Sequence, residues 1–396
     1  MERAENKKKP WMKYRHRVVR DIAYAVMYPY TRLKYNIKID KFKEQGNRPY
    51  LILMNHQTAF DQFFVGMAFR GPVYYVASED LFSNGWISSL LRWLVAPIPI
   101  KKQTSDVGAV KNCIRVAREG GTIAIAPEGN RTYSGRTGYM NPAIAGLARM
   151  LKLPIALFRI EGGYGVHPGW SDVVRRGRMH AYVSRVIEPE EFAGLSKAEL
   201  ESVIERGLYV DEGAADGTYD SDRSAEYLER AMYVCPWCGL SEFESHGNEI
   251  ECLRCRRKIN YGADKRLTGV GFDFPFEFVT GWDLDKYTQE PMYRDTANLS
   301  EVIVYKRKRL LRKDAAISLY GNRIVIDEGR PDELALLFDS IDALSVLGRN
   351  KLNIYHGEKL YQLKSGKRFN ALKYVNIYYR HKNVSRGDND GKFLGL

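Results

Sequence analysis

The spacing of apolar residues divides the chain into an α/β part and a later part made of short β-type runs. In the first part, short continuous apolar runs predict buried strands at 49–55, 73–77, 122–126, 154–160 and 179–187. Helical periodicity lies mainly between and after these runs, at 60–70, 83–94, 107–119, 143–151 and 195–205. Strands that alternate with helices predict an α/β layer with a largely buried sheet.

Beyond residue 268 the pattern changes to closely spaced strands separated by glycine turns. The strands are expected at 302–305, 316–320, 323–327, 335–338, 343–347, 352–355 and 360–363, and a helix at 369–380 follows them. We therefore expect a mostly β domain over 268–396. Its order, many strands and then one helix, resembles that of pleckstrin-homology-like domains.

The N-terminal segment is both basic and amphipathic. Apolar or aromatic residues recur at Val18, Ile22, Val26 and Tyr30, with arginines and lysines around them. A helix of this kind can lie in the interface of a bilayer. The alternative is that its apolar stripe docks on the protein's own core. We expect residues 1–40 to form basic amphipathic, membrane-associating helices.

Net charge is +13, and it is concentrated at the two ends of the chain. Residues 1–50 carry 14 Lys/Arg against 5 Asp/Glu, and residues 301–396 carry 19 against 11. This distribution suits an anionic partner, either a membrane or a nucleic acid, although a solvated basic face would look the same. No signal peptide or spanning segment is predicted, so the five cysteines are expected in a reducing compartment.

His56 and Asp61 follow the first predicted strand and form a candidate catalytic pair. A hydroxyl is a poor nucleophile until a base removes its proton, and histidine is the usual base near neutral pH. A carboxylate five residues on can return to the imidazole, fix its tautomer and stabilise its charged form. A pair at this spacing also arises by chance, so its place at the end of a buried strand is what favours catalysis.

A second polar turn, Glu128-Gly129-Asn130-Arg131, follows the predicted strand at 122–126. Gly129 allows a sharp turn, and the planar fork of Arg131 matches a phosphate group. Glu128 could pair with an arginine or accept a hydrogen bond from a substrate hydroxyl. Taken alone, this turn could equally be a surface turn with a salt bridge.

Together the two motifs resemble the glycerolipid acyltransferases, whose bacterial members include the 1-acylglycerol-3-phosphate acyltransferases. The resemblance covers about residues 15–190 and includes blocks at 98–102 and 153–157, although Lys102 stands where the family has arginine and Asn130 replaces a commoner threonine. It implies a glycerolipid acyltransferase-type sheet with flanking helices, at the cytoplasmic face of an anionic membrane. His56 and Asp61 would be catalytic, and Lys102, Glu128, Gly129 and Arg131 would hold the glycerol phosphate.

The same resemblance implies direct acyl transfer from acyl-CoA or acyl carrier protein to lysophosphatidate, giving phosphatidate in phospholipid biosynthesis. It requires no catalytic cofactor and no nucleic acid.

Two Cys-x2-Cys pairs form the other strong motif, comprising Cys235, Cys238, Cys252 and Cys255. Two such knuckles can place four thiolates around one Zn²⁺, and a site filled by four sulfurs is structural. Disulfides and a redox pair are the alternatives. We expect a zinc ribbon at 233–262, joined by a linker and short helix at 211–232 to an acyltransferase domain at 41–210.

Two rival functions remain open from the residues. One is an acyltransferase for another lysophospholipid. The other belongs to a different class, a zinc-ribbon nucleic-acid- or lipid-binding protein without catalysis. The basic arm adjoins the candidate catalytic pair and not the cysteines, which argues against nucleic-acid binding.

Overall fold

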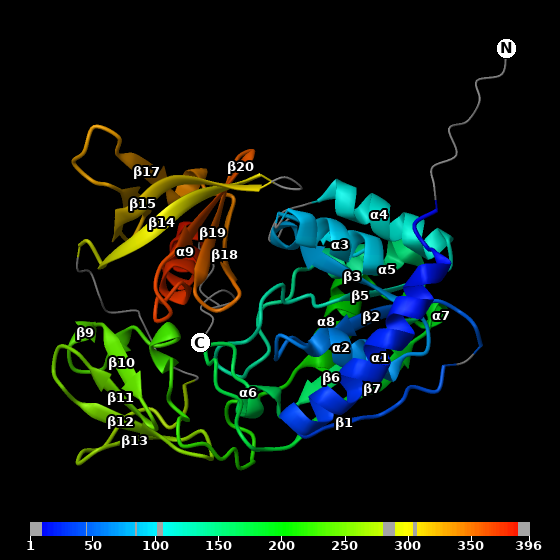
Figure 1. Cartoon of the computed structure of the whole chain (residues 1–396), viewed down its shortest axis with the longest axis horizontal. Helices are drawn as coiled ribbons and strands as arrows, with labels where there is room; N and C mark the ends of the chain where they lie inside the picture. Colours follow the sequence, from blue (N-terminus) through cyan, green and yellow to red (C-terminus); the bar gives the residue numbers. More distant parts are fainter. Residues whose placement is uncertain are drawn as a thin grey trace.

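The computed structural model describes residues 10–44, 46–83, 85–100, 106–279, 290–303 and 307–386. An α/β layer forms the N-terminal half, and a four-cysteine region and an antiparallel β half-barrel follow it (Figure 1). The predicted fold class is therefore confirmed.

The N-terminal half contains one mixed seven-stranded sheet and its helices. The strands are β1 Ile37–Ile39, β2 Leu51–Met54, β3 Val73–Ser78, β4 Ile98–Ile100, β5 Thr122–Ile125, β6 Ile155–Glu161 and β7 Met179–Ile187. The helices are α1 Tyr14–Tyr35, α2 Asp61–Ala68, α3 Trp86–Val95, α4 Val107–Arg118, α5 Ala143–Leu151, α6 Gly163–Val166, α7 Pro189–Ala193 and α8 Lys197–Leu208, with a 3-10 turn, η1, at Glu79–Phe82. The strand order is β1-β7-β6-β2-β5-β3-β4, and all neighbours run parallel except β6 and β7.

Strand β2 is buried on both faces, which explains its continuous apolar sequence. Leu51 and Leu53 share a core with α4, α5 and α8. Ile52 and Met54 share the opposite core with α1 and α2. Because β2 and β5 are parallel neighbours, the loops that follow them leave the sheet at the same edge. This edge carries both predicted polar motifs.

The second half of the chain combines two β structures. The cysteine region contains β8 Val234–Cys235, β9 Gly239–Leu240, β10 Phe243–His246, β11 Glu249–Cys252, β12 Lys258–Tyr261 and β13 Leu267–Gly269, after the 3-10 turn η2 at Leu228–Arg230. The half-barrel contains β14 Tyr293–Ile303, β15 Arg307–Leu319, β16 Arg323–Ile326, β17 Leu334–Leu337, β18 Ala343–Leu347, β19 Lys351–His356 and β20 Lys359–Lys364, with a 3-10 turn, η3, at Phe338–Ser340 and a closing helix α9 at Leu372–Arg386. Its strand order is β17-β16-β15-β14-β20-β19-β18, and every pairing is antiparallel.

One apolar core extends through the cysteine region and the half-barrel. It includes Tyr233 and Cys252 from the first and Tyr293 and Ile354 from the second. The Tyr293 hydroxyl also donates a hydrogen bond to the carbonyl of Tyr233. These two parts therefore pack as one body and not as separate modules on flexible linkers.

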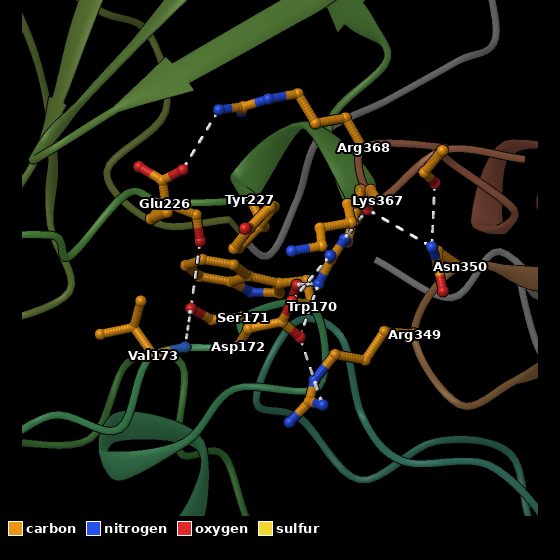
Figure 2. A network of polar contacts seen from close by, with 12 residues as sticks. Trp170, Ser171, Asp172, Val173, Glu226, Tyr227, Arg349, Asn350, Lys367 and Arg368 are labelled. Atoms are coloured by element: carbon orange, nitrogen blue, oxygen red, sulfur yellow. Dashed lines mark hydrogen bonds and ion pairs between the residues drawn. The ribbon is translucent and has the colours of Figure 1, made fainter.

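A buried arginine joins this body to the N-terminal half, in a polar network in which Asp172 also pairs with Arg349 (Figure 2). Arg230 is almost fully buried and donates to both carboxylate oxygens of Asp172, at 3.1 Å each. It also donates to the carbonyls of Trp170, at 2.8 Å, and of Lys367, at 2.6 Å. Asp172 in turn pairs with Arg349 of the half-barrel at 3.3 Å. A buried guanidinium needs such a set of acceptors, so the network fixes how the two halves sit together.

His167 lies at the same junction and must be neutral. Arg349 Nη2 lies 2.6 Å from His167 Nε2, and the Tyr35 hydroxyl lies 3.4 Å from Nδ1. An arginine can only donate, so Nε2 accepts and carries no proton. Burial, followed by the charges of Arg349 and Arg131, lowers the pKa of His167 to about 3.

No described helix combines the length and apolar character needed to cross a bilayer.

We predict that His167 makes the fold sensitive to mild acid. Between pH 6.5 and about 3 the unfolded chain binds a proton at this position and the native state does not. Stability is therefore lost as pH falls, by up to about 1.4 kcal/mol per pH unit from this group. His167→Gln should show a smaller fall in thermal unfolding temperature between pH 7 and pH 5 than the wild type.

The matched control is His246→Gln, which alters a largely exposed imidazole on β10 and should leave the wild-type pH dependence unchanged. Equal slopes for the wild type and His167→Gln would contradict the prediction.

Candidate active site

His56 and Asp61 meet at the carboxyl end of β2, as the sequence predicts. His56 Nδ1 lies 2.8 Å from Asp61 Oδ2. The Asp61 side chain is completely buried, whereas His56 is partly exposed and lines a cavity. A proton held on Nδ1 by the carboxylate leaves Nε2 as the nitrogen free to accept a proton. This is the arrangement of a general base.

The loop between the two residues folds around the Asp61 carboxylate. Oδ2 accepts from the amide of Gln57 at 2.7 Å, and Oδ1 accepts from the hydroxyl of Thr58 at 2.7 Å. The amide of Thr58 donates to both oxygens at 3.0 Å. These contacts hold the Asp61 carboxylate in the orientation in which it contacts the imidazole of His56. Sequence reasoning missed Thr58, although a threonine three residues before a helical aspartate is a capping signal.

Buried amides extend the support of this loop into the sheet. Asn55 exchanges two hydrogen bonds with the backbone of Ile160, each 2.8 Å long, and so ties the end of β2 to β6. Gln57 Oε1 accepts from the amide of Tyr164 at 3.1 Å. Both side chains are fully buried, so the loop that carries His56 is anchored on each side of it.

Glu128 faces the backbone of the catalytic loop. Its Oε1 accepts from the amide of His56 at 2.8 Å, and its Oε2 accepts from the amide of Gly138 at 2.7 Å. The amide of Thr132 donates to the carbonyl of His56 at 3.1 Å. The side chain is buried, and burial raises the pKa of Glu128 to about 8 against the opposing effect of the two amides. In this arrangement Glu128 positions His56.

The other residues of the second motif lie close by. Gly129 has φ +69° and lines the cavity beside His56, so its backbone is accessible there. Arg131 donates through Nη2 to the carbonyl of Gly348 in the β18–β19 turn. Its Nη1 is buried and has no hydrogen-bond partner among the described residues. Lys102 lies outside the described residues.

The cavity next to His56 has a volume of about 1140 Å³. Its walls come mainly from α1, α2, β3, α3, α4 and α5, and most of the lining side chains are apolar. This space exceeds a typical pocket for a small ligand and suits a long apolar chain. His56 and Gly129 are among the lining residues, so a chain in the cavity could place its polar end beside His56.

The four predicted metal ligands also come together. The sulfur atoms of Cys235, Cys238, Cys252 and Cys255 all lie within 4.8 Å of one another. Cys235 Sγ and Cys255 Sγ are 3.7 Å apart. Four sulfurs around a tetrahedral zinc, each at about 2.3 Å, would be about 3.8 Å apart. The cluster therefore fits a tetrahedral metal ion. Cys113 lies elsewhere, buried in α4.

Two known proteins that are similar to this chain are both named as 1-acyl-sn-glycerol-3-phosphate acyltransferases. Over 158 residues it is 25% identical to the 1-acyl-sn-glycerol-3-phosphate acyltransferase of Bacillus subtilis, covering 39% of this chain and 76% of that protein. Over 179 residues it is 21% identical to a chloroplastic 1-acyl-sn-glycerol-3-phosphate acyltransferase of Brassica napus, covering 44% of this chain and about half, 51%, of that protein.

A solved structure is also similar, the 1-acyl-sn-glycerophosphate acyltransferase of Thermotoga maritima. The match has 20% identity and a TM-score of 0.40, and it covers 49% of this chain and 79% of that one.

The family match falls on the part of the chain that carries both motifs. Residues 34–160 match the family described as Acyltransferase. This range includes His56, Asp61 and Glu128–Arg131, and it ends before the cysteine cluster. This part of the chain is therefore similar to the acyltransferase family, and the named relatives act on glycerolipids.

Proposed function

We propose that this protein transfers a fatty acyl group from a thioester donor to the free hydroxyl of 1-acylglycerol-3-phosphate, giving phosphatidate. The observation that carries the proposal is the buried Asp61 carboxylate held against His56 at the end of a large apolar cavity. The names of the relatives favour this acceptor over other lysophospholipids.

The reaction proceeds by direct transfer. His56 Nε2 takes the proton of the acceptor hydroxyl, and Asp61 stabilises the imidazolium that forms. The hydroxyl oxygen attacks the thioester carbonyl, forming a C–O bond. Collapse of the tetrahedral intermediate breaks the C–S bond, and the departing thiolate receives the proton from His56. The ester and a free thiol are the products, and no acyl-enzyme forms.

The second motif serves the acceptor in two ways. Arg131 and the backbone at Gly129 hold the glycerol phosphate, together with Lys102. An arginine fork can donate two parallel hydrogen bonds to a phosphate, and the buried Nη1 of Arg131 has a donor to spare. Glu128 acts mainly as a positioning residue, since both its oxygens accept from backbone amides.

The protein binds peripherally at the cytoplasmic face of an anionic membrane. Two exposed apolar stripes support this proposal. On α1 the stripe consists of Val18, Ile22, Val26 and Tyr30, and on α3 it consists of Trp86, Ile87, Leu90 and Trp93. The α1 stripe therefore faces outward and not into the protein's own core. The same two helices line the cavity on their other sides.

The four cysteines hold a structural Zn²⁺. Sulfur fills all four positions, so no site is open to a substrate or to a reactive water. The metal would brace the short strands β8 to β12, which are too small to form a stable core of their own. Kinship of the half-barrel with pleckstrin-homology domains stays a prediction from the order of its elements.

We predict that His56→Ala lowers kcat by about 10²–10⁴-fold, because the general base is lost. Purified wild type and variant are supplied with lysophosphatidate and, in separate assays, acyl-CoA or acyl carrier protein as donor, and phosphatidate is measured. His246→Ala removes an exposed imidazole and should retain full activity. Unchanged turnover in His56→Ala would refute the role of the base. Absence of phosphatidate from the wild type with both donors would refute the function.

We predict that the α3 stripe contributes to membrane binding. Trp86→Ser combined with Trp93→Ser should weaken cosedimentation with vesicles of phosphatidylcholine and phosphatidylglycerol by about tenfold or more, since each buried aromatic contributes about 1.5–3 kcal/mol. Leu337→Ser changes a similarly exposed apolar residue on β17 and should bind like the wild type. Equal binding of all three proteins would argue against the stripe.

We predict about one zinc ion per chain by elemental analysis of protein purified without chelators. Cys252→Ser combined with Cys255→Ser should abolish this metal content and lower the unfolding temperature, because metal binding contributes to folding free energy. Cys113→Ala lies outside the cluster and should keep the zinc. A metal-free wild type with four reactive thiols in the cluster would overturn the assignment.

A further inference from the structure

The cavity that contains His56 is not enclosed by the acyltransferase domain alone. Leu347, Gly348 and Lys351, at the β18–β19 turn, line it together with Lys308 at the start of β15. These residues lie far beyond residue 160, where the family match ends. The half-barrel therefore supplies part of the wall of the space in which the acyl transfer is proposed to occur.

The β18–β19 turn is held firmly against the catalytic loops. Arg131 donates to the carbonyl of Gly348, and the hydroxyl of Tyr133 donates to the carbonyl of Arg349 at 3.0 Å. The Arg349 side chain contacts His167 at 2.6 Å and Asp172 at 3.3 Å. Contacts on both the backbone and the side chain fix the turn, so Lys351, two residues beyond Arg349, starts from a well-defined position.

The half-barrel brings positive charge to this wall. Among the described residues, the other arginine or lysine that lines the cavity is Arg20 on α1, which is paired with Asp21 and the carbonyl of Phe69. The one acidic lining residue in the described chain, Asp106, accepts from the amide of Ala109 and caps α4. The half-barrel therefore adds two lysines, Lys308 and Lys351, to a cavity wall whose other described cation is Arg20.

The two lysines differ in how they are held. Lys308 Nζ donates to the side-chain oxygen of Gln362 at 3.0 Å. The Lys351 ammonium has no hydrogen bond or ion pair within the described part of the chain. An ammonium that has no partner within the protein can donate charge-assisted hydrogen bonds to an anionic ligand.

We infer that Lys351 binds a phosphate group of a substrate in this cavity, with Lys308 as a second lysine on the same wall. The inference rests on the proposed function for the identity of the substrate. The phosphate belongs either to the lysophosphatidate acceptor or to the thioester donor, whose pantetheine arm ends in a phosphate. In both cases the half-barrel takes part in substrate selection, and its lysines add to the cations that the acyltransferase domain provides.

The first test measures binding without catalysis. Glycerol 3-phosphate is titrated calorimetrically into the wild type, Lys351→Met, Lys351→Arg and Lys359→Met. Lys359 is an exposed lysine on β20 that does not line the cavity, so it is the matched control. An acceptor-phosphate site predicts binding about tenfold or more weaker in Lys351→Met, since a hydrogen bond between charged groups is lost. Lys351→Arg should recover part of the affinity, and Lys359→Met should match the wild type.

The second test separates the two sources of phosphate. Steady-state kinetics compare lysophosphatidate with monoacylglycerol as acceptor, and acyl-CoA with acyl-pantetheine, which lacks phosphate, as donor. A Lys351→Met defect in KM confined to lysophosphatidate assigns the acceptor, whereas a defect confined to acyl-CoA assigns the donor.

The outcomes distinguish this inference from the proposed function. Wild-type values for Lys351→Met, both in the titration and with every substrate, overturn the inference while leaving the acyl transfer intact. A wild type without acyl transfer refutes the proposed function, and the titration then still decides whether Lys351 binds a phosphate.

Discussion

The site depends on a simple constraint: a carboxyl group can be buried only if its oxygens find hydrogen-bond partners. Asp61 and Glu128 are both buried, and each satisfies this requirement with groups of the loops after β2 and β5. The loop that carries His56 folds around Asp61 and donates hydrogen bonds to its carboxylate. Glu128 connects the His56 amide to Gly138, in the loop after the neighbouring strand. Because unsatisfied carboxylates would be costly, these loops are strongly restrained, and the imidazole is held in position before any substrate arrives.

The two halves of the chain meet at this same region. The network around Asp172 and Arg230 sets their orientation, and the contacts of Arg131 and Tyr133 place the β18–β19 turn beside the cavity. His167 is buried at this junction among several arginines, so its imidazole must remain neutral. The half-barrel and the acyltransferase domain therefore share buried polar groups that neither could satisfy alone.

The elements in which apolar residues recur with one clear period could be predicted well. The bounds of α5, β7 and β18 are as expected, and β2 and β5 differ from prediction by one or two residues at an end. Strand β14 was predicted only at 302–305, because residues 293–301 are mostly polar and their period is weak. The short helix expected within 211–232 is limited to the 3-10 turn η2.

For the site, sequence spacing placed His56 beside Asp61 and brought the four cysteines together. It did not predict that Glu128 faces the backbone of His56, because local spacing does not say which way a buried side chain turns. It also could not predict the contact of Arg349 with His167, since that contact joins residues more than 180 positions apart. Long-range contacts of this kind follow from how whole domains pack, which no local pattern encodes.

One consequence follows from the hydrogen bond between Arg131 and the carbonyl of Gly348. The family match ends at residue 160, yet part of the wall of the cavity beside His56 is contributed by residues near 350. The family match and the cavity therefore have different boundaries along the chain. A fragment limited to residues 34–160 would carry His56 and Asp61 but would lack the side of the cavity that the half-barrel supplies.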